Sequence, residues 1–206
     1  MILYNSFNEF YLAIQFALLF LLAFLGIQDL KERKIFVFPL FIFDIILNII
    51  FLAIGYYAST FFFIISYLEF LWSWKELKVF NLGYLYFLTP LLLLLSHDQQ
   101  TIILSYSFFV IGFIHLISGF GKGDIKVMDS VALSTAFIYK YTGFPLFLPP
   151  VFIIFLIASL SGLIAYPLYK RSFIKTKKED FDKIPLVFHL WLGYLVFLIL
   201  SLPQLV

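Results

Sequence analysis

Apolar runs long enough to cross a bilayer recur along the whole chain, and they constrain its fold more than any other feature. A hydrocarbon core about 30 Å thick requires about 20 mainly apolar residues per helix. On this basis we expect eight helical segments, residues 7–28, 36–57, 60–74, 79–96, 101–119, 130–148, 150–169 and 184–203. The prediction is an all-α fold, a polytopic transmembrane helical bundle of about eight helices. Counts of six or seven are also compatible with the sequence, because Glu69 interrupts the third segment and Lys140 the sixth.

The composition supports a membrane protein and excludes several other classes. Hydrophobic residues make up 63% of the 206 and charged residues 13%, whereas soluble domains are about half apolar and about a quarter charged. There is no cysteine, which excludes disulfides, thiolate nucleophiles, cysteine-based zinc sites and iron–sulfur clusters. The net charge of +2 is too small to indicate a nucleic-acid partner. We therefore expect residues 1–206 to form a single integral membrane domain.

The positions of the basic residues predict the orientation of the chain in the bilayer. Lysines and arginines lie in the connections after the first, third, fifth and seventh segments, and only Lys140 falls elsewhere. Cytoplasmic loops of membrane proteins carry an excess of Lys and Arg. We therefore place these four connections, including a basic loop over residues 170–183, in the cytoplasm. The chain is then a multi-pass protein of the cell membrane with both ends outside.

Two aspartates are expected at the cytoplasmic face and at similar depth, although they are 95 residues apart in the sequence. Asp29 ends the first segment, and Asp124 follows a glycine-rich stretch, residues 119–123, that predicts a flexible turn open to close approach by another segment. Two carboxylates held close cannot both ionise readily, so one keeps a proton near neutral pH. The ionised group can take a proton from water while the protonated group polarises a peptide carbonyl. This is the chemistry of an aspartic protease.

The residues around both aspartates resemble the two motifs of the type IV prepilin peptidase family, and most closely those of its compact archaeal branch, the preflagellin (prearchaellin) peptidases. In the first motif an aspartate ends the first helix and is followed by alternating basic residues and an isoleucine, matched here by Asp29, Lys31, Arg33 and Ile35. The second motif is G-x-G-D with a lysine two positions after the acid, matched here by Gly121, Gly123, Asp124 and Lys126. Family members also start their last helix with an extended, proline-containing stretch, which residues 183–186 resemble.

The resemblance implies a G-x-G-D aspartic endopeptidase with Asp29 and Asp124 as the catalytic pair and with no metal or other cofactor. Its substrates would be pilin-like or archaellin precursors, whose short basic leader is removed at the cytoplasmic face. The cysteine-rich domain of many bacterial members is missing, so we expect no methyltransferase activity. Phe36 stands where the family usually has proline. The spacing of the aspartates is also longer than usual, which an extra helical hairpin over residues 60–96 would explain.

Three acids in the last basic connection form a candidate binding site for the leader peptide. Glu179, Asp180 and Asp182 follow a run of lysines and would attract a basic leader that those lysines repel. The favoured interpretation is that the acids only offset the neighbouring lysines. Exposed ion pairs contribute about 0–1 kcal/mol each, so the three acids could change affinity but could not create the activity. Glu32 and Asp129 are the alternative acids for this role.

Asp44, Glu69 and His115 lie inside predicted helices, where ionisable groups are costly. The favoured interpretation is a buried, hydrogen-bonded or protonated structural role for Asp44 and Glu69 and a packed hydrogen-bonding role for His115. They support a second hypothesis, a proton-coupled small membrane transporter in which these residues and the two aspartates form a relay. The strongest acid motifs lie at helix ends rather than at the midplane, which favours the peptidase. Neither an H-E-x-x-H motif nor a glycine-flanked serine with a matching histidine is apparent, so zinc and serine proteases are not favoured.

Overall fold

The computed structural model of the 206-residue chain describes residues 2–32, 35–75, 83–94, 98–118, 122–136, 149–176 and 184–205. Within these ranges it contains eight α-helices and one 3-10 helix, and no strand. They are α1 (Ile2–Glu32), α2 (Phe38–Ala53), α3 (Ser59–Lys75), α4 (Gly83–Tyr86), the 3-10 helix η1 (Thr89–Leu94), α5 (Gln99–Ser118), α6 (Lys122–Thr135), α8 (Pro150–Thr176) and α9 (Leu186–Leu205). The predicted all-α helical bundle of about eight helices is therefore confirmed.

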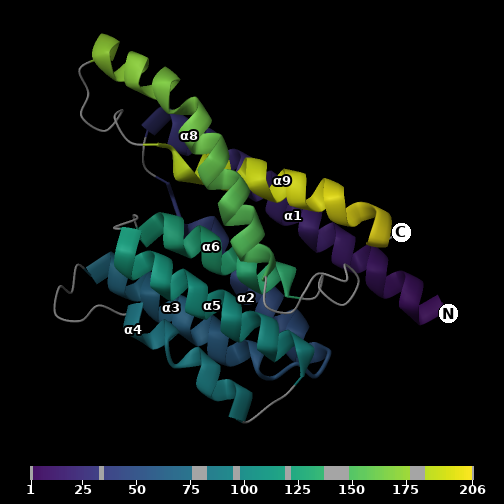
Figure 1. Ribbon diagram of the computed structural model, residues 1–206. Helices are drawn as coiled ribbons and strands as arrows, with labels where there is room; N and C mark the ends of the chain where they lie inside the picture. Colours follow the sequence, from purple (N-terminus) through teal and green to yellow (C-terminus); the bar gives the residue numbers. More distant parts are fainter. Residues whose placement is uncertain are drawn as a thin grey trace.

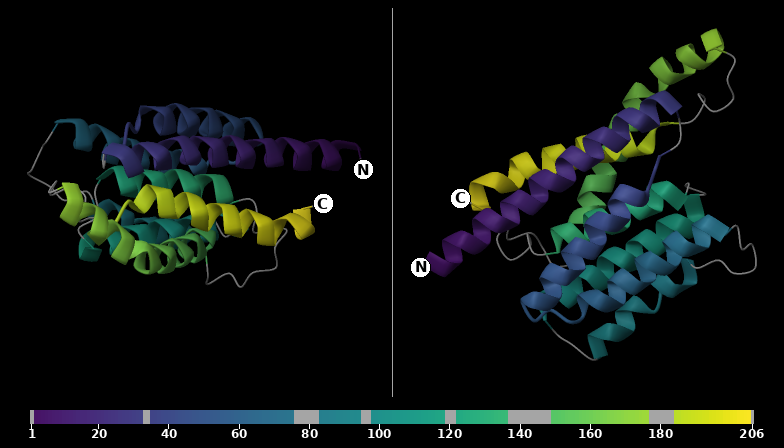
Figure 2. Two further views of the ribbon diagram at one scale, coloured as in Figure 1. Left: turned by 90° about the horizontal axis from the view of Figure 1, so that it is seen from above. Right: turned by 180° about the vertical axis from the view of Figure 1, so that it is seen from behind.

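The helices form two groups that are joined by α6 (Figures 1 and 2). In the first group α8 packs on α9, and α1 and α9 run side by side in opposite directions, so that both chain ends lie at the same end of the molecule. The second group contains α2, α3, α4, η1 and α5. Helix α6 contacts α1, α8 and α9 from the first group and α2, α3 and α5 from the second. It is therefore the central helix of the molecule.

Three helices are long and apolar enough to cross a membrane, over Glu9–Glu32, Gln99–Leu116 and Pro150–Arg171. The shorter apolar helices cover Phe38–Ala53, Ser59–Leu68, Tyr84–Leu94 and Leu186–Ser201. Large apolar side chains also face outward, for example Phe20, which is 73% exposed, and Ile164, which is 80% exposed. An extensive apolar surface is unusual for a soluble monomer, so these helices have the character of membrane segments.

The predicted fourth helix is wrong as a single element. Residues 83–94 form α4, a turn and then η1. Pro90 has no backbone N–H and disfavours the helical conformation at Thr89, which prevents one α-helix from running through the segment. The Thr89 hydroxyl lies 2.7 Å from the carbonyl oxygen of Tyr86 and 3.1 Å from that of Ser105. It can donate to either carbonyl, and the contact with Ser105 joins the start of η1 to α5.

The predicted start of the sixth helix is wrong. The sequence predicts a loop up to residue 129 and a helix over 130–148, whereas α6 begins at Lys122 and ends at Thr135, and residues 137–148 lie outside the described ranges. Hydropathy fails here because α6 is rich in polar residues, although every residue from 125 to 136 is buried. The Ser130 hydroxyl donates to the carbonyl of Lys126 at 3.1 Å, and the Thr135 hydroxyl donates to that of Val131 at 2.7 Å. Such bonds within the helix allow hydroxyl groups to be buried.

Helix α8 is longer than the sequence predicts. It contains Pro167 and continues to Thr176, so that Lys170, Arg171 and Lys175 lie in a helix rather than in a loop. Figure 1 shows this end of α8 extending beyond its neighbours. The basic residues of this connection are therefore presented in part by a helical extension.

The end of α6 is held by side chains from α1 and α9. The Tyr11 hydroxyl and the Gln15 amide nitrogen both donate to the carbonyl oxygen of Ser134, at 2.7 and 2.8 Å. The Tyr194 hydroxyl of α9 donates to the Gln15 amide oxygen. The last carbonyls of a helix have no partner within it, so these bonds satisfy the buried end of α6 and join three helices.

Candidate active site

Asp29 lies in the last turn of α1 and is held by the start of α9. Its side chain is 7% exposed, and the backbone N–H of Val187 donates a hydrogen bond to its Oδ2 at 3.0 Å. Val187 is the second residue of α9, and the first N–H groups of a helix have no partner within the helix. A helix N-terminus also favours a nearby negative charge. The position of the Asp29 carboxylate therefore depends on α9.

The segment that follows Asp29 is tied back to α1. Residues 35–37 are not helical, and the N–H of Phe36 donates to the Gln28 amide oxygen at 3.1 Å. A proline at position 36 would lack this N–H and could not form the bond. Pro39 instead lies at the start of α2, where a missing N–H costs little.

Gly123 packs directly against this segment. A Cβ atom placed on Gly123 would lie 2.8 Å from Cγ1 of Ile35 and 3.7 Å from Cγ1 of Val37. The first distance is too short for two carbon atoms, so a larger residue would require Ile35 to move. Because Gly123 immediately precedes Asp124, the two motif segments are in contact across α6 and the connection between α1 and α2.

Asp124 lies in the first turn of α6 and is half-buried. The sequence predicts a flexible turn here, but Gly123 and Asp124 belong to the helix. A carboxylate in the first turn is favoured by the unpaired N–H groups and the helix dipole. The acid is thus carried by a helix that contacts α1.

The other motif and leader-site residues fall into two sets. Lys31 and Glu32 are exposed, and the Gln28 amide nitrogen donates to Glu32 at 3.3 Å. Several predicted residues lie outside the residues that the structure describes: Arg33, Gly121, Glu179, Asp180 and Asp182. Leader binding by the last three stays a prediction.

Asp129 is an unsuitable alternative for binding a leader peptide. It is fully buried, and its Oδ2 accepts a hydrogen bond from the Tyr86 hydroxyl at 2.7 Å. The bond joins α6 to α4 inside the second group of helices. A peptide at the surface could not reach this carboxylate without opening the core.

Lys126 is not in a loop, contrary to the sequence prediction. It is 2% exposed, and its Nζ lies 2.6 Å from Oδ2 of Asp44, which is fully buried on α2. The same nitrogen donates to the Ser66 hydroxyl on α3, and the Ser130 hydroxyl lies 3.1 Å from Asp44 Oδ2. The motif lysine therefore points into the core, where it joins α6 to α2 and α3.

This ion pair also bears on the proposed relay of Asp44, Glu69 and His115. Asp44 is paired with Lys126 at 2.6 Å and lies 3.1 Å from the Ser130 hydroxyl. His115 is half-buried on α5, and the side chain of Glu69 is not among those that the structure describes. The structure thus ties Asp44, one member of the relay, to α6.

A buried histidine network was not foreseen from the sequence. The Ser161 hydroxyl lies 2.8 Å from His189 Nδ1, and the Tyr169 hydroxyl lies 2.9 Å from His189 Nε2. Ser161 is followed by Gly162, and its histidine partner is 28 residues further along the chain. No fixed spacing marks this pair, which only the packing of α8 on α9 brings together.

The hydrogen bonds assign this network a structural role. The Ser161 hydroxyl donates to the carbonyl of Ala158 at 2.9 Å, so His189 Nδ1–H can donate to the serine oxygen while Nε2 accepts from Tyr169. In this arrangement the imidazole does not accept the serine proton, as a nucleophilic serine would require. His189 is 2% exposed and is only two residues beyond Val187. The network therefore fixes the first turn of α9, which holds Asp29.

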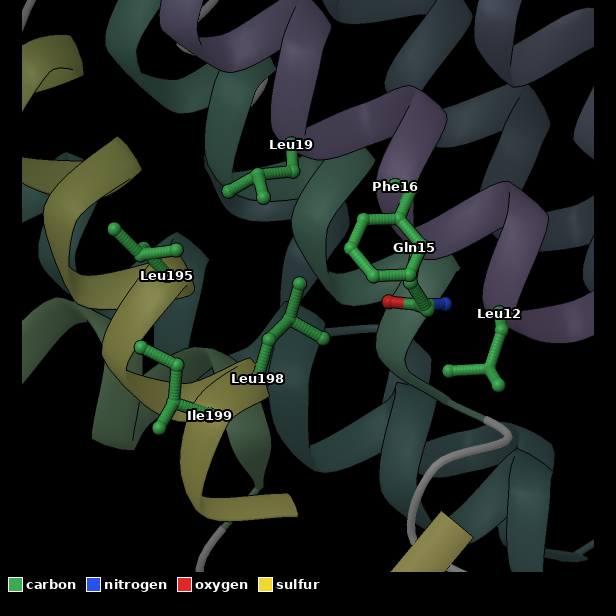
Figure 3. Close-up of a pocket in the computed structure, with 7 residues that line it drawn as sticks. All are labelled: Leu12, Gln15, Phe16, Leu19, Leu195, Leu198 and Ile199. Atoms are coloured by element: carbon green, nitrogen blue, oxygen red, sulfur yellow. The ribbon is translucent and has the colours of Figure 1, made fainter. Parts of the chain in front are cut away.

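A small cavity of about 110 Å³ lies between α1 and α9 (Figure 3). Gln15 contributes the one polar side chain, and the other lining residues are Leu12, Phe16, Leu19, Leu195, Leu198 and Ile199. No aspartate, glutamate or histidine lines it, so it offers no acid–base chemistry. Among the residues that the structure describes, no group of three or more such side chains is placed to hold a metal ion.

Comparison with known proteins gives no match to the chain among protein-family models, curated proteins or solved structures.

Proposed function

We propose that the protein is a membrane aspartic endopeptidase that removes the short basic leader from type IV prepilin-like or prearchaellin precursors, with Asp29 and Asp124 as its catalytic pair. The observation that carries the proposal is the contact of Gly123 with Ile35. It joins the two segments on which the family resemblance rests, although they are far apart in the sequence. Asp29 is also buried at a helix end and bonded to Val187, as a positioned reactive carboxylate would be.

The proposed reaction needs one water molecule and the two carboxyl groups. The ionised aspartate takes a proton from the water, whose oxygen attacks the carbonyl carbon of the scissile peptide bond. The protonated aspartate donates a hydrogen bond to the carbonyl oxygen and supports the tetrahedral intermediate. Collapse of this intermediate breaks the C–N bond, and a proton passes to the leaving nitrogen. The products are the leader with a new carboxylate and the mature protein with a new amino terminus.

The active site is proposed to lie at the cytoplasmic face of a multi-pass protein of the cell membrane. The apolar helix of the precursor would then lie in the bilayer beside the enzyme while its leader reaches the aspartates. Because the chain has no cysteine, single cysteines at positions 31, 75, 122 and 177 can be labelled without background. All four should be protected from impermeant reagents in intact cells, and labelling of position 75 from outside would contradict this orientation.

The function is tested by co-expressing the protein with a tagged prepilin and, separately, a tagged prearchaellin. Mass spectrometry of the precursor should show loss of the leader and a new amino terminus without methylation. A matched precursor with neutral residues in place of the basic leader residues should be cleaved more slowly if the charges are recognised. Intact precursors of both kinds beside a correctly inserted protein would overturn the proposal.

A further inference from the structure

The Lys126–Asp44 pair is the sole ion pair found among the described side chains, and it lies in the core. Lys126 is 2% exposed and Asp44 is fully buried. Their contact of 2.6 Å joins α6 to α2, and the bond from Lys126 to Ser66 adds α3. Asp44 Oδ1 has no hydrogen-bond partner within the described part of the chain. Asp44 therefore depends on Lys126 and Ser130 for its stabilisation.

Helix geometry relates this pair to Asp124. Successive residues of an α-helix are rotated by about 100° around its axis, so Asp124 and Lys126 project in directions about 200° apart. When Lys126 points toward Asp44, Asp124 points away from α2. Gly123 lies between these directions, against Ile35. The ion pair and the glycine contact therefore specify the same rotation of α6.

Other rotations of α6 are strongly disfavoured by the buried charges. Turning the helix by one residue would separate Lys126 from Asp44 and leave an unpaired charge in the core. Breaking a buried ion pair is far more costly than losing a pair at the surface.

We propose that Lys126 and Asp44 are positioning residues, whose complementarity sets the rotation of α6 and so directs Asp124 out of the core. The significance for catalysis rests on the proposed function, whereas the effect on α6 does not. Neither residue touches the reacting atoms in this account. Asp44 thereby receives a role that neither the motif resemblance nor the relay hypothesis gives it.

The rotation can be measured by disulfide formation, independently of any activity. Cysteines at positions 35 and 123 should form a disulfide, because a Cβ on Gly123 would lie 2.8 Å from the Ile35 Cγ1 atom that is bonded to the Ile35 Cβ. A control pair at positions 26 and 188 lies between α1 and α9, where a Cβ on Gly26 would be 3.6 Å from the Phe188 Cβ. Disulfides require Cβ atoms about 3.5–4.5 Å apart. The rates under mild oxidation are then compared among K126M, D44N, D44N/K126M and Y86F in both backgrounds.

The 35–123 disulfide should form at least about tenfold more slowly in K126M and D44N, where a buried charge loses its partner. In D44N/K126M, which removes both charges at similar volume, the rate should return to within about threefold of the starting rate. Y86F removes a buried hydrogen bond from α4 to Asp129 of α6 but leaves the Lys126–Asp44 pair intact, so its 35–123 rate should not change. The 26–188 rate should be constant in all four variants. If K126M fails to insert, D44N and the double variant provide the same comparison.

Two results would overturn the proposal. An unchanged 35–123 rate in the single variants would mean that the pair does not set the rotation. A double variant as slow as K126M would mean that complementarity is not the cause. Cleavage assays without the extra cysteines separate this inference from the proposed function. If Asp124 is catalytic, K126M should lower kcat about 100-fold at nearly constant KM. The kcat should recover in D44N/K126M.

The two possible failures are distinct. If the unmodified protein cleaves no precursor while the disulfide rates behave as expected, the proposed function fails and the positioning role stands. If cleavage is observed and the disulfide rates are unchanged in the single variants, the function stands and the positioning role fails.

Discussion

The two groups of helices hold their halves of the candidate site by different physical means. In the group of α1, α8 and α9, Asp29 receives a backbone N–H from Val187, and His189 ties α9 to α8 through two hydroxyl groups. In the group built around α2 and α3, the helix that carries Asp124 is held by the buried Lys126–Asp44 ion pair. In the first group, removal of a hydroxyl that bonds to His189 leaves no unpaired full charge in the core. The other relies on two full charges.

Because one half is held by neutral hydrogen bonds and the other by a buried ion pair, single substitutions should affect their stability differently. A neutral hydrogen bond contributes about 0.5–1.5 kcal/mol to stability, so its loss is graded. Removal of one member of a buried ion pair costs about 3–5 kcal/mol, because an unpaired charge remains in the core. We therefore expect the Asp29 side to tolerate single substitutions and the Asp124 side to respond much more sharply.

The largest effect is expected at Lys126. Lys126→Met should lower the free energy of unfolding by about 3–5 kcal/mol, because it leaves Asp44 in the core without its ionic partner. The same substitution at exposed Lys31 is the matched control and should change stability by less than about 0.5 kcal/mol. Unfolding in mixed detergent micelles provides the measurement. Equal losses of unfolding free energy at Lys126 and Lys31 would contradict the claim that the buried ion pair dominates the stability of the second group.

A second prediction concerns close helix packing within the first group. A Cβ on Gly193 would lie 2.4 Å from the backbone carbonyl oxygen of Ile154, so Gly193→Ala should force α8 and α9 apart at a cost of about 1–3 kcal/mol. Gly162→Ala serves as the control, because its Cβ would lie 3.0 Å from Cγ2 of Ile184, a side chain that can shift. Thermal unfolding should rank Gly193→Ala as clearly the more damaging. If Gly162→Ala is the more destabilising, the close contact between Gly193 and Ile154 does not determine the stability of the α8–α9 packing.

The smallest effect is expected in the histidine network. Tyr169→Phe and Ser161→Ala each remove one neutral hydrogen bond to His189 and should cost about 1 kcal/mol. Tyr57→Phe, at a side chain that is 73% exposed, is the control and should cost less than about 0.5 kcal/mol. A loss at Tyr169 as large as that at Lys126 would contradict the distinction between neutral and charged attachment.

The sequence predicts the outer helices better than the central one. Apolar runs locate α1, α5 and α9 within a few residues because apolar residues dominate their sequences. The same criterion misplaces α6, whose Lys126, Asp129 and Ser130 find their partners only after the other helices have assembled. It also misses the break at Pro90, because leucines on both sides dominate the average.

In the candidate site, too, the features carried by local motifs could be predicted, and the contacts between distant residues could not. Local motifs identify Asp29 and Asp124 and predict that Gly123 permits a close approach, which the contact with Ile35 bears out. The partner of Lys126 could not be predicted, since Asp44 is 82 residues away and carries no motif. The bond from Val187 to Asp29 spans 158 residues and likewise depends on how α9 packs against α1.

The most direct test of the central claim is leader cleavage by Asp29→Asn and Asp124→Asn in the purified protein. Each variant keeps the side-chain size but cannot share a proton between two carboxyl groups, so cleavage should fall by about 100- to 10,000-fold. Asp98→Asn is the matched control, because Asp98 bonds to Thr101 at the start of α5 and asparagine caps a helix equally well. Loss in both site variants with normal cleavage by the control is the predicted result. Near-normal cleavage by either site variant would contradict the assignment of the catalytic pair.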